Sequence, residues 1–337
     1  MEYRSLGRTG VKVSELCLGA MNFGDRTGPE EAQAIMDRAL AAGINFVDTA
    51  NMYSRGRSEE IVGEALKQSG QRDRVVLATK VYNPMSEDVN DRGNSRRHII
   101  QQCEASLKRL QTDYIDLYQI HRPQSDIPID ETLRALDDLV RAGMVRYIGT
   151  STFAAWQLVE ALWASRELNL NRFVSEQPPY NLVDRRIERE LLPMAQTYGL
   201  GLIVWSPLAM GLLTGKYDFR EVPAGDTRFG QQKARVNPVQ QARWTEGAFE
   251  VVSVLKAIAS EKGCTPAQLA LAWCVRKPGI TSAIIGPRTT DQLEDNLAAL
   301  NVEITEDDHR RLDQAAEPGG SVSPFYQADF GPHPHRI

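Results

Sequence analysis

The sequence predicts an α/β fold: a (β/α)8 TIM barrel with an N-terminal β-hairpin and long loops at the C-terminal face of the barrel. Short apolar runs alternate along the chain with longer segments of helical periodicity, which is the pattern of parallel βα units. Eight such runs follow the predicted hairpin, and eight strands close this barrel. The 337 residues, of which 42% are hydrophobic, suffice for one large core, so we expect a single domain over residues 1–337.

Two β-type runs, residues 3–6 and 11–13, precede the repeats and flank the turn Gly7-Arg8-Thr9-Gly10. We expect them to pair as a hairpin that plugs one end of the barrel. The eight barrel strands are then predicted at Leu16–Gly19, Phe46–Asp48, Val75–Lys80, Ile115–Gln119, Tyr147–Ser151, Phe173–Gln177, Gly201–Trp205 and Ser282–Gly286.

Helical patterns lie between these strands. Several begin with an N-cap or a proline at the first helical position, as at Gly28-Pro29 and Thr265-Pro266. The predicted helices are Pro29–Ala42, Ser58–Gln68, Ser95–Leu110, Asp130–Ala142, Ala154–Glu167, Ile187–Tyr198, the pair Thr245–Lys262 and Pro266–Arg276, and Thr289–Leu300.

Three segments interrupt the alternation. Residues 80–94 form a polar loop directly after a strand, and residues 217–243 have no clear periodicity. Long loops at the C-terminal face of a barrel form lids or binding walls. Residues 317–337, rich in Gly, Pro and His, are predicted to be an irregular C-terminal tail. The sequence leaves open whether this tail closes over the barrel mouth or frays.

Composition argues against several classes of function. The net charge of -5 and the pI of about 5.7 give no electrostatic reason to expect nucleic acid, so small molecules are the expected partners. Cys17, Cys103, Cys264 and Cys274 form no Cys-x-x-Cys pair, which favours a reduced protein without metal. The N-terminus lacks an apolar signal core and no stretch approaches a membrane span. We therefore expect a cytoplasmic protein.

Four polar residues stand where the chemistry of a barrel is found. Asp48, Lys80 and His121 close three of the apolar runs, and Tyr53 follows Asp48 by five positions on the adjoining loop. Because the C-terminal ends of parallel strands meet at one mouth, we expect the four side chains to converge there.

This combination suits proton donation to a carbonyl oxygen. A tyrosine is a poor acid at neutral pH, but a neighbouring ammonium stabilises the phenolate and lowers the phenol pKa. A carboxylate beside the lysine keeps the amine charged, and an imidazole can orient the carbonyl. A Schiff-base aldolase also uses a lysine at a barrel mouth. Asp48 argues against that alternative because a paired amine stays protonated and is a poor nucleophile.

The chain resembles the aldo-keto reductases, including their branch of potassium-channel beta subunits. The resemblance rests on Asn45-Phe46-Val47-Asp48-Thr49-Ala50-Asn51-Met52-Tyr53, Ala78-Thr79-Lys80 and Leu117-Tyr118-Gln119-Ile120-His121, and it extends from Leu6 to about Leu300. It implies a barrel that binds a nicotinamide dinucleotide without a Rossmann domain. No Gly-x-Gly-x-x-Gly fingerprint is present, in agreement with this. By resemblance, Tyr53 is the general acid, Lys80 lowers its pKa, Asp48 holds Lys80, and His121 positions the carbonyl.

The resemblance also implies a set of cofactor contacts. Ser151 and Gln177 would bind the nicotinamide carboxamide, Trp205 would stack on its ring, and the segment Ser206–Tyr217 would fold over the pyrophosphate. Arg288 would bind a ribose 2′-phosphate, which favours NADPH/NADP+ over NADH. The full predicted set is Met21, Asp48, Ser151, Gln177, Trp205, Ser206, Pro207, Leu208, Gly211, Lys216, Gly286, Arg288, Gln292, Asp295 and Asn296.

One position departs from the resemblance. Many relatives carry Ser-Asn-Phe after the fifth strand, whereas this chain has Ser151-Thr152-Phe153 and so lacks a side-chain amide near the expected carboxamide. Two functions remain open: NADPH-dependent reduction of aldehydes or ketones, and an NADPH-binding redox sensor or regulatory subunit with little turnover. The carbonyl substrate and the oligomeric state are not determined by the sequence. Met21, Asn22, Phe23, Tyr53, Tyr82, Arg122 and Trp205 are the residues expected to line the mouth.

Overall fold

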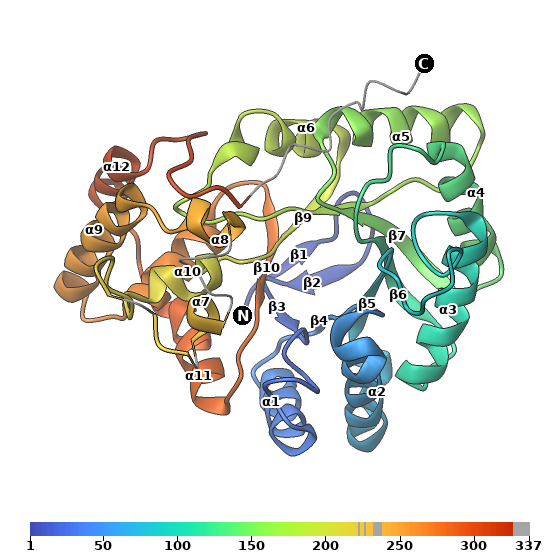
Figure 1. Ribbon diagram of the computed structural model, residues 1–337, viewed down its shortest axis with the longest axis horizontal. Coiled ribbons are helices and arrows are strands. Elements are labelled where there is room, and N and C mark those ends of the chain that lie inside the picture. The colour runs from blue at the N-terminus through green and yellow to red at the C-terminus, as the bar shows by residue number, and fades with distance from the viewer. Residues whose placement is uncertain (222, 226, 232–237, 326–337) are drawn as a thin grey trace.

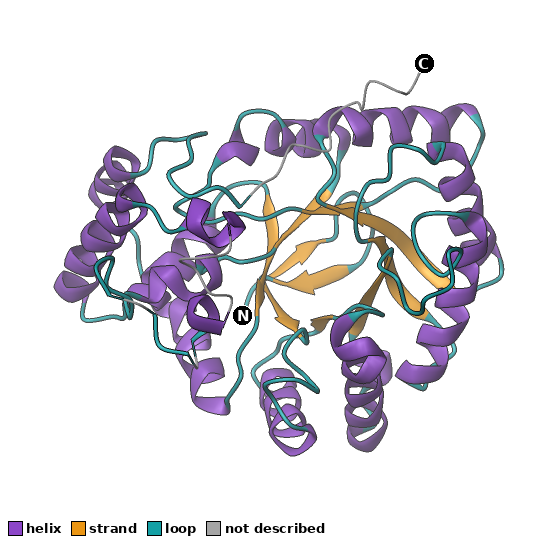
Figure 2. Ribbon diagram, viewed as in Figure 1, coloured by secondary structure: helices purple, strands orange, loops and turns teal. Residues whose placement is uncertain are grey.

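Eight parallel strands form a closed barrel in the computed structural model, which describes residues 1–221, 223–225, 227–231 and 238–325. This confirms the predicted fold class. Figures 1 and 2 show the strands as an inner ring with helices around it. In order around the barrel the strands are β10 (Ile280–Ile285), β3 (Leu16–Gly19), β4 (Phe46–Asp48), β5 (Val76–Val81), β6 (Ile115–Ile120), β7 (Val145–Ser151), β8 (Ser175–Gln177) and β9 (Gly201–Val204).

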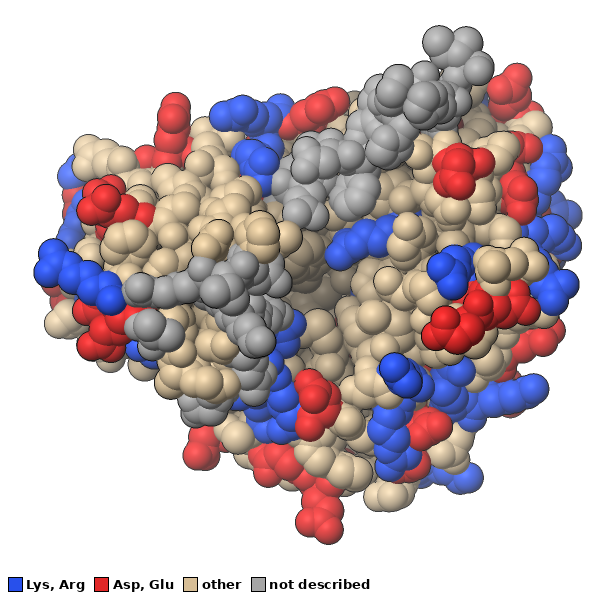
Figure 3. Space-filling view, in the orientation of Figure 1, with Lys and Arg blue, Asp and Glu red and all other residues tan. Residues whose placement is uncertain are grey.

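The register of the strands brings their C-terminal ends to one mouth. Asp48 at the end of β4 pairs with Ala78 of β5, and Lys80 of β5 pairs with Gln119 of β6. On the face drawn in Figure 3 the molecule is hollowed over the centre of the barrel. Polar side chains at the strand ends therefore share one concave site, as parallel pairing requires.

The N-terminal hairpin, β1 (Tyr3–Ser5) and β2 (Lys12–Ser14), covers the opposite end of the barrel, as predicted. Arg4 donates from Nη1 to the carbonyl oxygen of Ile280, the first residue of β10. Apolar side chains of the hairpin and of the barrel interior form one buried cluster, so this end is a packed core. Its buried members are Leu6, Val13, Cys17, Phe46, Ala78, Leu117, Val174 and Ile203.

Helices form the outer layer, and a second apolar core lies between them and the strands. Among the described residues, no helix is both long and apolar enough to cross a membrane. The α-helices are α1 (Pro29–Ala41), α2 (Arg57–Ser69), α3 (Arg96–Leu110), α4 (Ile129–Arg141), α5 (Ala155–Glu167), α6 (Leu191–Tyr198), α7 (Arg228–Gln231), α8 (Pro238–Arg243), α9 (Glu246–Lys262), α10 (Pro266–Arg276), α11 (Thr290–Ala298) and α12 (Glu306–Ala315). The short 3₁₀ helices are η1 (Tyr53–Gly56), η2 (Arg72–Arg74), η3 (Arg186–Glu188), η4 (Ala209–Thr214) and η5 (Ala299–Asn301).

One predicted helix was wrong in extent. The pattern Ile187–Tyr198 predicts a continuous helix, but the chain forms η3 and then α6, with Glu190 between them at φ -138° and ψ -51°. Pro193 falls in the first turn of α6, where a missing backbone N–H leaves no intrahelical bond unmade. The last predicted helix likewise ends early, because α11 stops at Ala298 and continues as η5.

Three helices were not predicted. α12 begins at a capping box in which Thr305 and Asp308 hydrogen-bond to each other's backbone N–H groups, a spacing that the sequence displays. α7 and α8 lie within the segment 217–243, which lacks periodicity because both helices are short. That segment and the loop between β5 and α3 are the long loops expected at the C-terminal face.

The described part of the C-terminal tail, residues 317–325, has no helix or strand but is packed. Ser321 forms an isolated bridge with Asp184, and Ser323 donates from Oγ to the carbonyl oxygen of Arg243 at 2.8 Å. The Arg243 guanidinium lies 4.5 Å from the ring centroid of Phe325, which is 1% exposed. These residues are therefore not frayed. The rest of the predicted tail, 326–337, lies outside the described residues.

We expect Phe325→Ala to destabilise the protein by about 3–5 kcal/mol, because a buried ring is lost from a packed site. The measurement is the free energy of unfolding from urea denaturation. Trp163→Ala is the matched control: Trp163 is 65% exposed on α5, so its loss should cost less than about 0.5 kcal/mol. Equal effects of the two substitutions would contradict the packed position of Phe325.

Candidate active site

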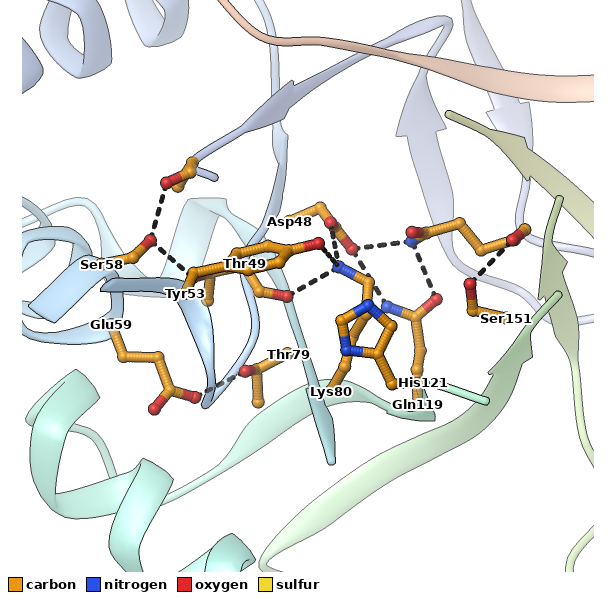
Figure 4. Close-up of polar contacts among 12 residues, drawn as sticks. Asp48, Thr49, Tyr53, Ser58, Glu59, Thr79, Lys80, Gln119, His121 and Ser151 are labelled. Atoms are coloured by element: carbon orange, nitrogen blue, oxygen red, sulfur yellow. Dashed lines mark hydrogen bonds and ion pairs between the residues drawn. The ribbon is translucent and has the colours of Figure 1, made fainter. Parts of the chain in front are cut away.

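Lys80 lies at the centre of the mouth and uses all three of its N–H donors. Its Nζ is 2.5 Å from Asp48 Oδ2, 2.8 Å from the Thr49 carbonyl oxygen and 3.3 Å from Tyr53 Oη (Figure 4). Lys80 is fully buried and Asp48 is 2% exposed. The structure thus brings Asp48, Tyr53 and Lys80 together as the sequence predicted, with the phenol held at the open side of the ion pair.

The lysine remains an ammonium in this setting. Burial is the largest influence and acts to lower the pKa of Lys80, but the charge and hydrogen bonds of Asp48 and Tyr53 outweigh it, so the pKa is raised. A protonated amine cannot attack a carbonyl carbon. The geometry therefore argues against the Schiff-base alternative.

Two glutamines complete the shell of Asp48. Gln119 and Gln177 each donate from Nε2 to Asp48 Oδ1, at 3.0 and 2.8 Å, and Gln177 Nε2 is 3.1 Å from Gln119 Oε1. Sequence reasoning placed Gln177 at the nicotinamide and missed Gln119. The available signal was the position of Gln119 two residues before His121, which puts both side chains on one face of β6.

His121 faces the phenol from the neighbouring strand end. Its ring meets that of Tyr53 edge-on, with centroids 5.8 Å apart, and its Nδ1 lies 3.4 Å from Asn83 Nδ2. Burial, together with the positive charges of Lys80 and Arg122, holds the pKa of His121 well below its usual range. The imidazole is therefore neutral. An amide N–H donor beside Nδ1 favours the tautomer that carries the ring proton on Nε2. Asn83 was not predicted as a site residue.

Helix α2 supports the site from behind (Figure 4). Ser58 Oγ bonds to Thr49 Oγ1 at 2.8 Å and to the carbonyl oxygen of Ala20 at 2.7 Å. The next residue, Glu59, is fully buried and accepts from Thr79 Oγ1. It is also paired with Arg109 Nε at 2.6 Å. These contacts tie the ends of β4 and β5 to one helix, and no sequence motif indicated them.

The end of β7 carries backbone strain. Thr152 has a φ of +64°, in the left-handed region that β-branched residues rarely occupy. Its N–H donates to the Gln177 carbonyl oxygen at 3.2 Å, and Arg122 donates to its Oγ1. The adjacent Ser151 donates from Oγ to the same Gln177 carbonyl at 2.9 Å. Thr152, the position at which the sequence departs from the resemblance, thus has a hydroxyl that is already engaged.

A buried acid lies behind this strand end. Glu176 of β8 is fully buried, accepts from Thr150 Oγ1 at 2.5 Å and accepts from the Phe153 N–H at 3.0 Å. Burial raises the pKa of Glu176 from 4.5 to about 8, although its hydrogen bonds and the charge of Arg122 partly oppose the shift. Glu176 is therefore mostly protonated at neutral pH. It was not among the predicted site residues.

The segment after β9 is a tight turn with left-handed residues. Ser206, Ala209 and Met210 have φ values of 54°, 48° and 57°, and Gly211 follows at 90°. Such turns can direct N–H groups toward one side as a concave anion site, but those of Ala209 and Gly211 donate within the turn, to the carbonyl oxygens of Ser206 and Leu208. Trp205, at the start of the segment, is half-buried. The predicted residues Pro207 and Leu208 belong to the same turn, and Lys216 at its end is exposed.

The predicted adenosine end is only partly assembled as expected. Gly286 is exposed, and its carbonyl oxygen accepts from Asn22 Nδ2 at 3.0 Å. Arg288 is half-buried, and its backbone N–H donates to Gln292 Oε1 at 2.9 Å. Asp295 instead accepts hydrogen bonds at the start of α10, and Asn296 is 8% exposed. Met21 is 42% exposed and lies 3.9 Å from an Arg228 nitrogen.

Comparison with known proteins agrees with the geometry. A family model described as "Aldo/keto reductase family" matches residues 15–317. Proteins from Oryza sativa subsp. japonica and Arabidopsis thaliana, both named "Probable voltage-gated potassium channel subunit beta", are 42% and 40% identical over 90% of this chain and 92% of theirs. "Uncharacterized oxidoreductase YrpG" of Bacillus subtilis (strain 168) is 43% identical over 97% of this chain and 99% of that protein.

Glu176 should make stability depend on pH in a defined direction. Its pKa is raised on folding, so its contribution is fully present below about pH 4.5 and is lost as the pH rises toward 8. Relative to Glu176→Gln, the wild type should lose up to about 1.4 kcal/mol of unfolding free energy per pH unit across that range. Urea denaturation of both proteins at several pH values measures this difference, and a difference that does not change with pH would contradict the protonated state of Glu176.

Proposed function

The chain belongs to the aldo/keto reductase family, and on that premise we propose that it reduces aldehydes and ketones to alcohols, reversibly, with NADPH as the electron donor. The observation that carries the proposal is the buried ammonium of Lys80, shared between Asp48 and the hydroxyl of Tyr53. Together with a neutral His121 at the same mouth, this is an acid site designed for a carbonyl oxygen.

Tyr53 is the proton donor in this proposal. Lys80 stabilises the phenolate that remains after the proton leaves, and Asp48 keeps Lys80 charged throughout. The proton passes from Tyr53 Oη to the carbonyl oxygen as negative charge develops on that oxygen. When bound, the nicotinamide supplies a hydride to the carbonyl carbon. The same steps in reverse oxidise an alcohol.

His121 orients the substrate. Its Nε2–H is free of the Asn83 contact, which is made by Nδ1, and it can donate to the same carbonyl oxygen. A neutral imidazole is suited to this task because it donates without bringing a second positive charge beside Lys80. The two donors then hold the carbonyl between Tyr53 and His121.

The residues present fit a nicotinamide dinucleotide. The turn at Ser206, Ala209 and Met210 has the left-handed backbone of anion-binding turns, and the exposed Lys216 at its end carries a positive charge that suits a pyrophosphate. Trp205, at the end of β9, offers a half-buried aromatic face to the nicotinamide. Arg288 precedes the N-terminus of α11, where a guanidinium and orphan N–H groups favour a phosphate. The proposed preference for NADPH over NADH rests on this arginine.

The other proposed cofactor contacts fall into two groups, one at each end of the dinucleotide. Met21, Asp48, Ser151 and Gln177 would surround the nicotinamide end, and Gly286, Gln292 and Asn296 the adenosine end. Asp295 would have to exchange its contacts with Thr265 and Gln268 to reach a ribose. We therefore regard it as the least supported member of the set.

A second function is favoured by the names of two relatives. Both plant relatives are named as probable potassium-channel beta subunits, so the second function that we propose is that of an NADPH-binding redox sensor or regulatory subunit with little turnover. The two functions differ in rate and in partners. A panel of aldehydes and ketones assayed with NADPH and NADH in parallel tests the first, and NADPH-dependent co-purification of a partner protein tests the second.

We also propose that the protein acts in the cytoplasm as a single barrel domain on small carbonyl compounds. The four cysteines are unpaired, and Cys17, Cys103 and Cys274 are buried. Unpaired cysteines suit a reducing compartment.

Tyr53→Phe should lower kcat for carbonyl-dependent NADPH oxidation by about 10²–10⁴-fold, because the proton donor is lost while the ring remains. The rate is followed by the loss of NADPH absorbance. Tyr3→Phe is the matched control: Tyr3 bonds to the Gly43 carbonyl in the hairpin at the other end of the barrel, so its activity should equal that of the wild type. Full turnover by Tyr53→Phe would show that another group donates the proton.

Arg288→Gln should raise the KM for NADPH by about 10–100-fold and leave the KM for NADH nearly unchanged, because only NADPH carries the 2′-phosphate. Steady-state kinetics with both cofactors measures this selectivity. Arg97→Gln, which removes an exposed arginine on α3, serves as the control for loss of one charge. A parallel loss of both cofactors in Arg288→Gln would assign Arg288 a structural role instead.

A further inference from the structure

Arg122 places a guanidinium on the wall of the mouth between two strand ends. It follows His121 directly after β6, and its Nη1 donates to Thr152 Oγ1 just beyond β7. Its charge acts on His121, and the phenol of Tyr53 in turn acts on Arg122. The guanidinium therefore belongs to the same mouth as Tyr53 and His121.

No carboxylate of the described residues forms an ion pair with Arg122. The acid that influences it most is Glu176, which is mainly protonated at neutral pH because it is buried. The other side chains that interact with the guanidinium electrostatically are the phenols of Tyr53 and Tyr82, and neither is a carboxylate. The chain thus leaves the positive charge of Arg122 uncompensated inside a partly buried site.

Two other arginines of this chain, one buried and one half-buried, are compensated by carboxylates, whereas the buried Arg243 donates to the carbonyl oxygen of Pro324. Arg185 is paired with Glu188 and Asp313, at 2.9 and 2.6 Å, and Arg109 is paired with Glu59. Those arginines hold the fold together through carboxylates. Arg122 has a hydroxyl as its side-chain partner and is not explained by the same structural role. A partly buried charge without a partner is costly, so such a charge persists where a ligand supplies the partner.

We propose that Arg122 binds a carboxylate on the substrate, so that the preferred substrates are carbonyl compounds with a carboxylate near the reacting carbonyl. This inference rests on the carbonyl-reducing function proposed above. The guanidinium fork matches the two oxygens of a carboxylate, and Arg122 is close enough to His121 to act on its charge, so one substrate can contact both groups. Arg122 is thus assigned as a specificity-determining residue for the same site.

The surroundings favour a carboxylate over a phosphate. One carboxylate balances the single charge of Arg122, whereas a phosphate dianion would leave excess negative charge in a partly buried site. Arg228 of α7 also interacts with Tyr53 electrostatically, but the carboxylate of Asp25 acts on Arg228 as well, so the positive field that we argue from at the mouth is that of Arg122. Lys and Arg side chains border the hollow in Figure 3. Such a field attracts anionic substrates to the site.

The test compares 3- and 4-formylbenzoate with their methyl esters, as substrates of the wild type, Arg122→Met, Arg122→Lys and Arg97→Met with NADPH. The esters carry the same aldehyde without the charge. Glyceraldehyde 3-phosphate and glyceraldehyde form a second pair that reports on phosphate. The quantity measured is the ratio of kcat/KM for the charged compound to that for its neutral partner.

We expect Arg122→Met to lower the ratio for at least one formylbenzoate by about 10–100-fold, mainly through KM, while kcat/KM for the ester changes little. Arg122→Lys should keep part of the ratio because it keeps the charge without the fork. Arg97→Met should match the wild type, because this arginine is exposed on α3.

Three results would overturn the inference. The first is an unchanged ratio in Arg122→Met. The second is an equal fall in kcat/KM for acid and ester, which would make Arg122 a structural or positioning residue. A loss confined to the phosphate pair would replace the carboxylate with a phosphate.

A binding measurement separates failure of the inference from failure of the proposed function. Isophthalate and the neutral isophthalamide cannot be reduced at an aldehyde, so calorimetric titration of the protein in excess NADP+ needs no turnover. Isophthalate should bind the wild type at least about 10-fold more tightly than Arg122→Met, with no such difference for isophthalamide. If the esters are not reduced but this difference is found, carbonyl reduction fails and the carboxylate site stands. If the esters are reduced and the difference is absent, the carboxylate site fails alone.

Discussion

The ion pair between Lys80 and Asp48 is the constraint around which the site is built. Removing an ammonium and a carboxylate from water is costly, and the pair is tolerated only when the remaining donors and acceptors are also satisfied. Here Thr49 and Tyr53 take the other two N–H groups of the lysine, and two amides cover the second oxygen of Asp48. Tyr53 is the one partner in this set with a hydroxyl proton to give. The demand for satisfied hydrogen bonds therefore also fixes the phenol where acid chemistry needs it.

The barrel can satisfy these hydrogen bonds because the C-terminal ends of its strands meet at one mouth. β4 contributes Asp48, β5 contributes Lys80 and β6 contributes Gln119, and the parallel register holds the three in one layer. Helix α2 then fixes the loop ends through Ser58 and Glu59. Side chains that are anchored at strand ends and tied to a helix have little freedom to move apart. Its side chains are preorganised for charge that develops during a reaction.

The convergence of parallel strand ends also explains which site residues the sequence could predict. Asp48, Lys80 and His121 each close an apolar run, and parallel pairing brings such ends together whatever the intervening helices do. Gln119 and Glu176 lie within strands, and their roles depend on their neighbours in the fold: Gln119 bonds to Asp48, whereas Glu176 bonds to Thr150 of the adjacent strand and to the Phe153 N–H after it. Helix ends depend on local competition, as at Glu190, where one non-helical residue separates η3 from α6. Asp295 has the predicted spacing, but a nearer partner, the N-terminus of α10, takes its carboxylate.

Thr152 and Arg122 are best understood as one local arrangement. Asparagine tolerates the left-handed backbone that this position requires, whereas threonine adopts it at a cost of about 1–3 kcal/mol. The surrounding contacts hold Thr152 in place: its N–H bonds to Gln177 and its hydroxyl accepts from Arg122. That hydroxyl orients the guanidinium and leaves its positive charge intact. A carboxylate in the same place would neutralise the charge. Thr152, where the sequence departs from the resemblance, thus coincides with an arginine that is fixed in direction and, in our proposal, keeps its charge for a substrate.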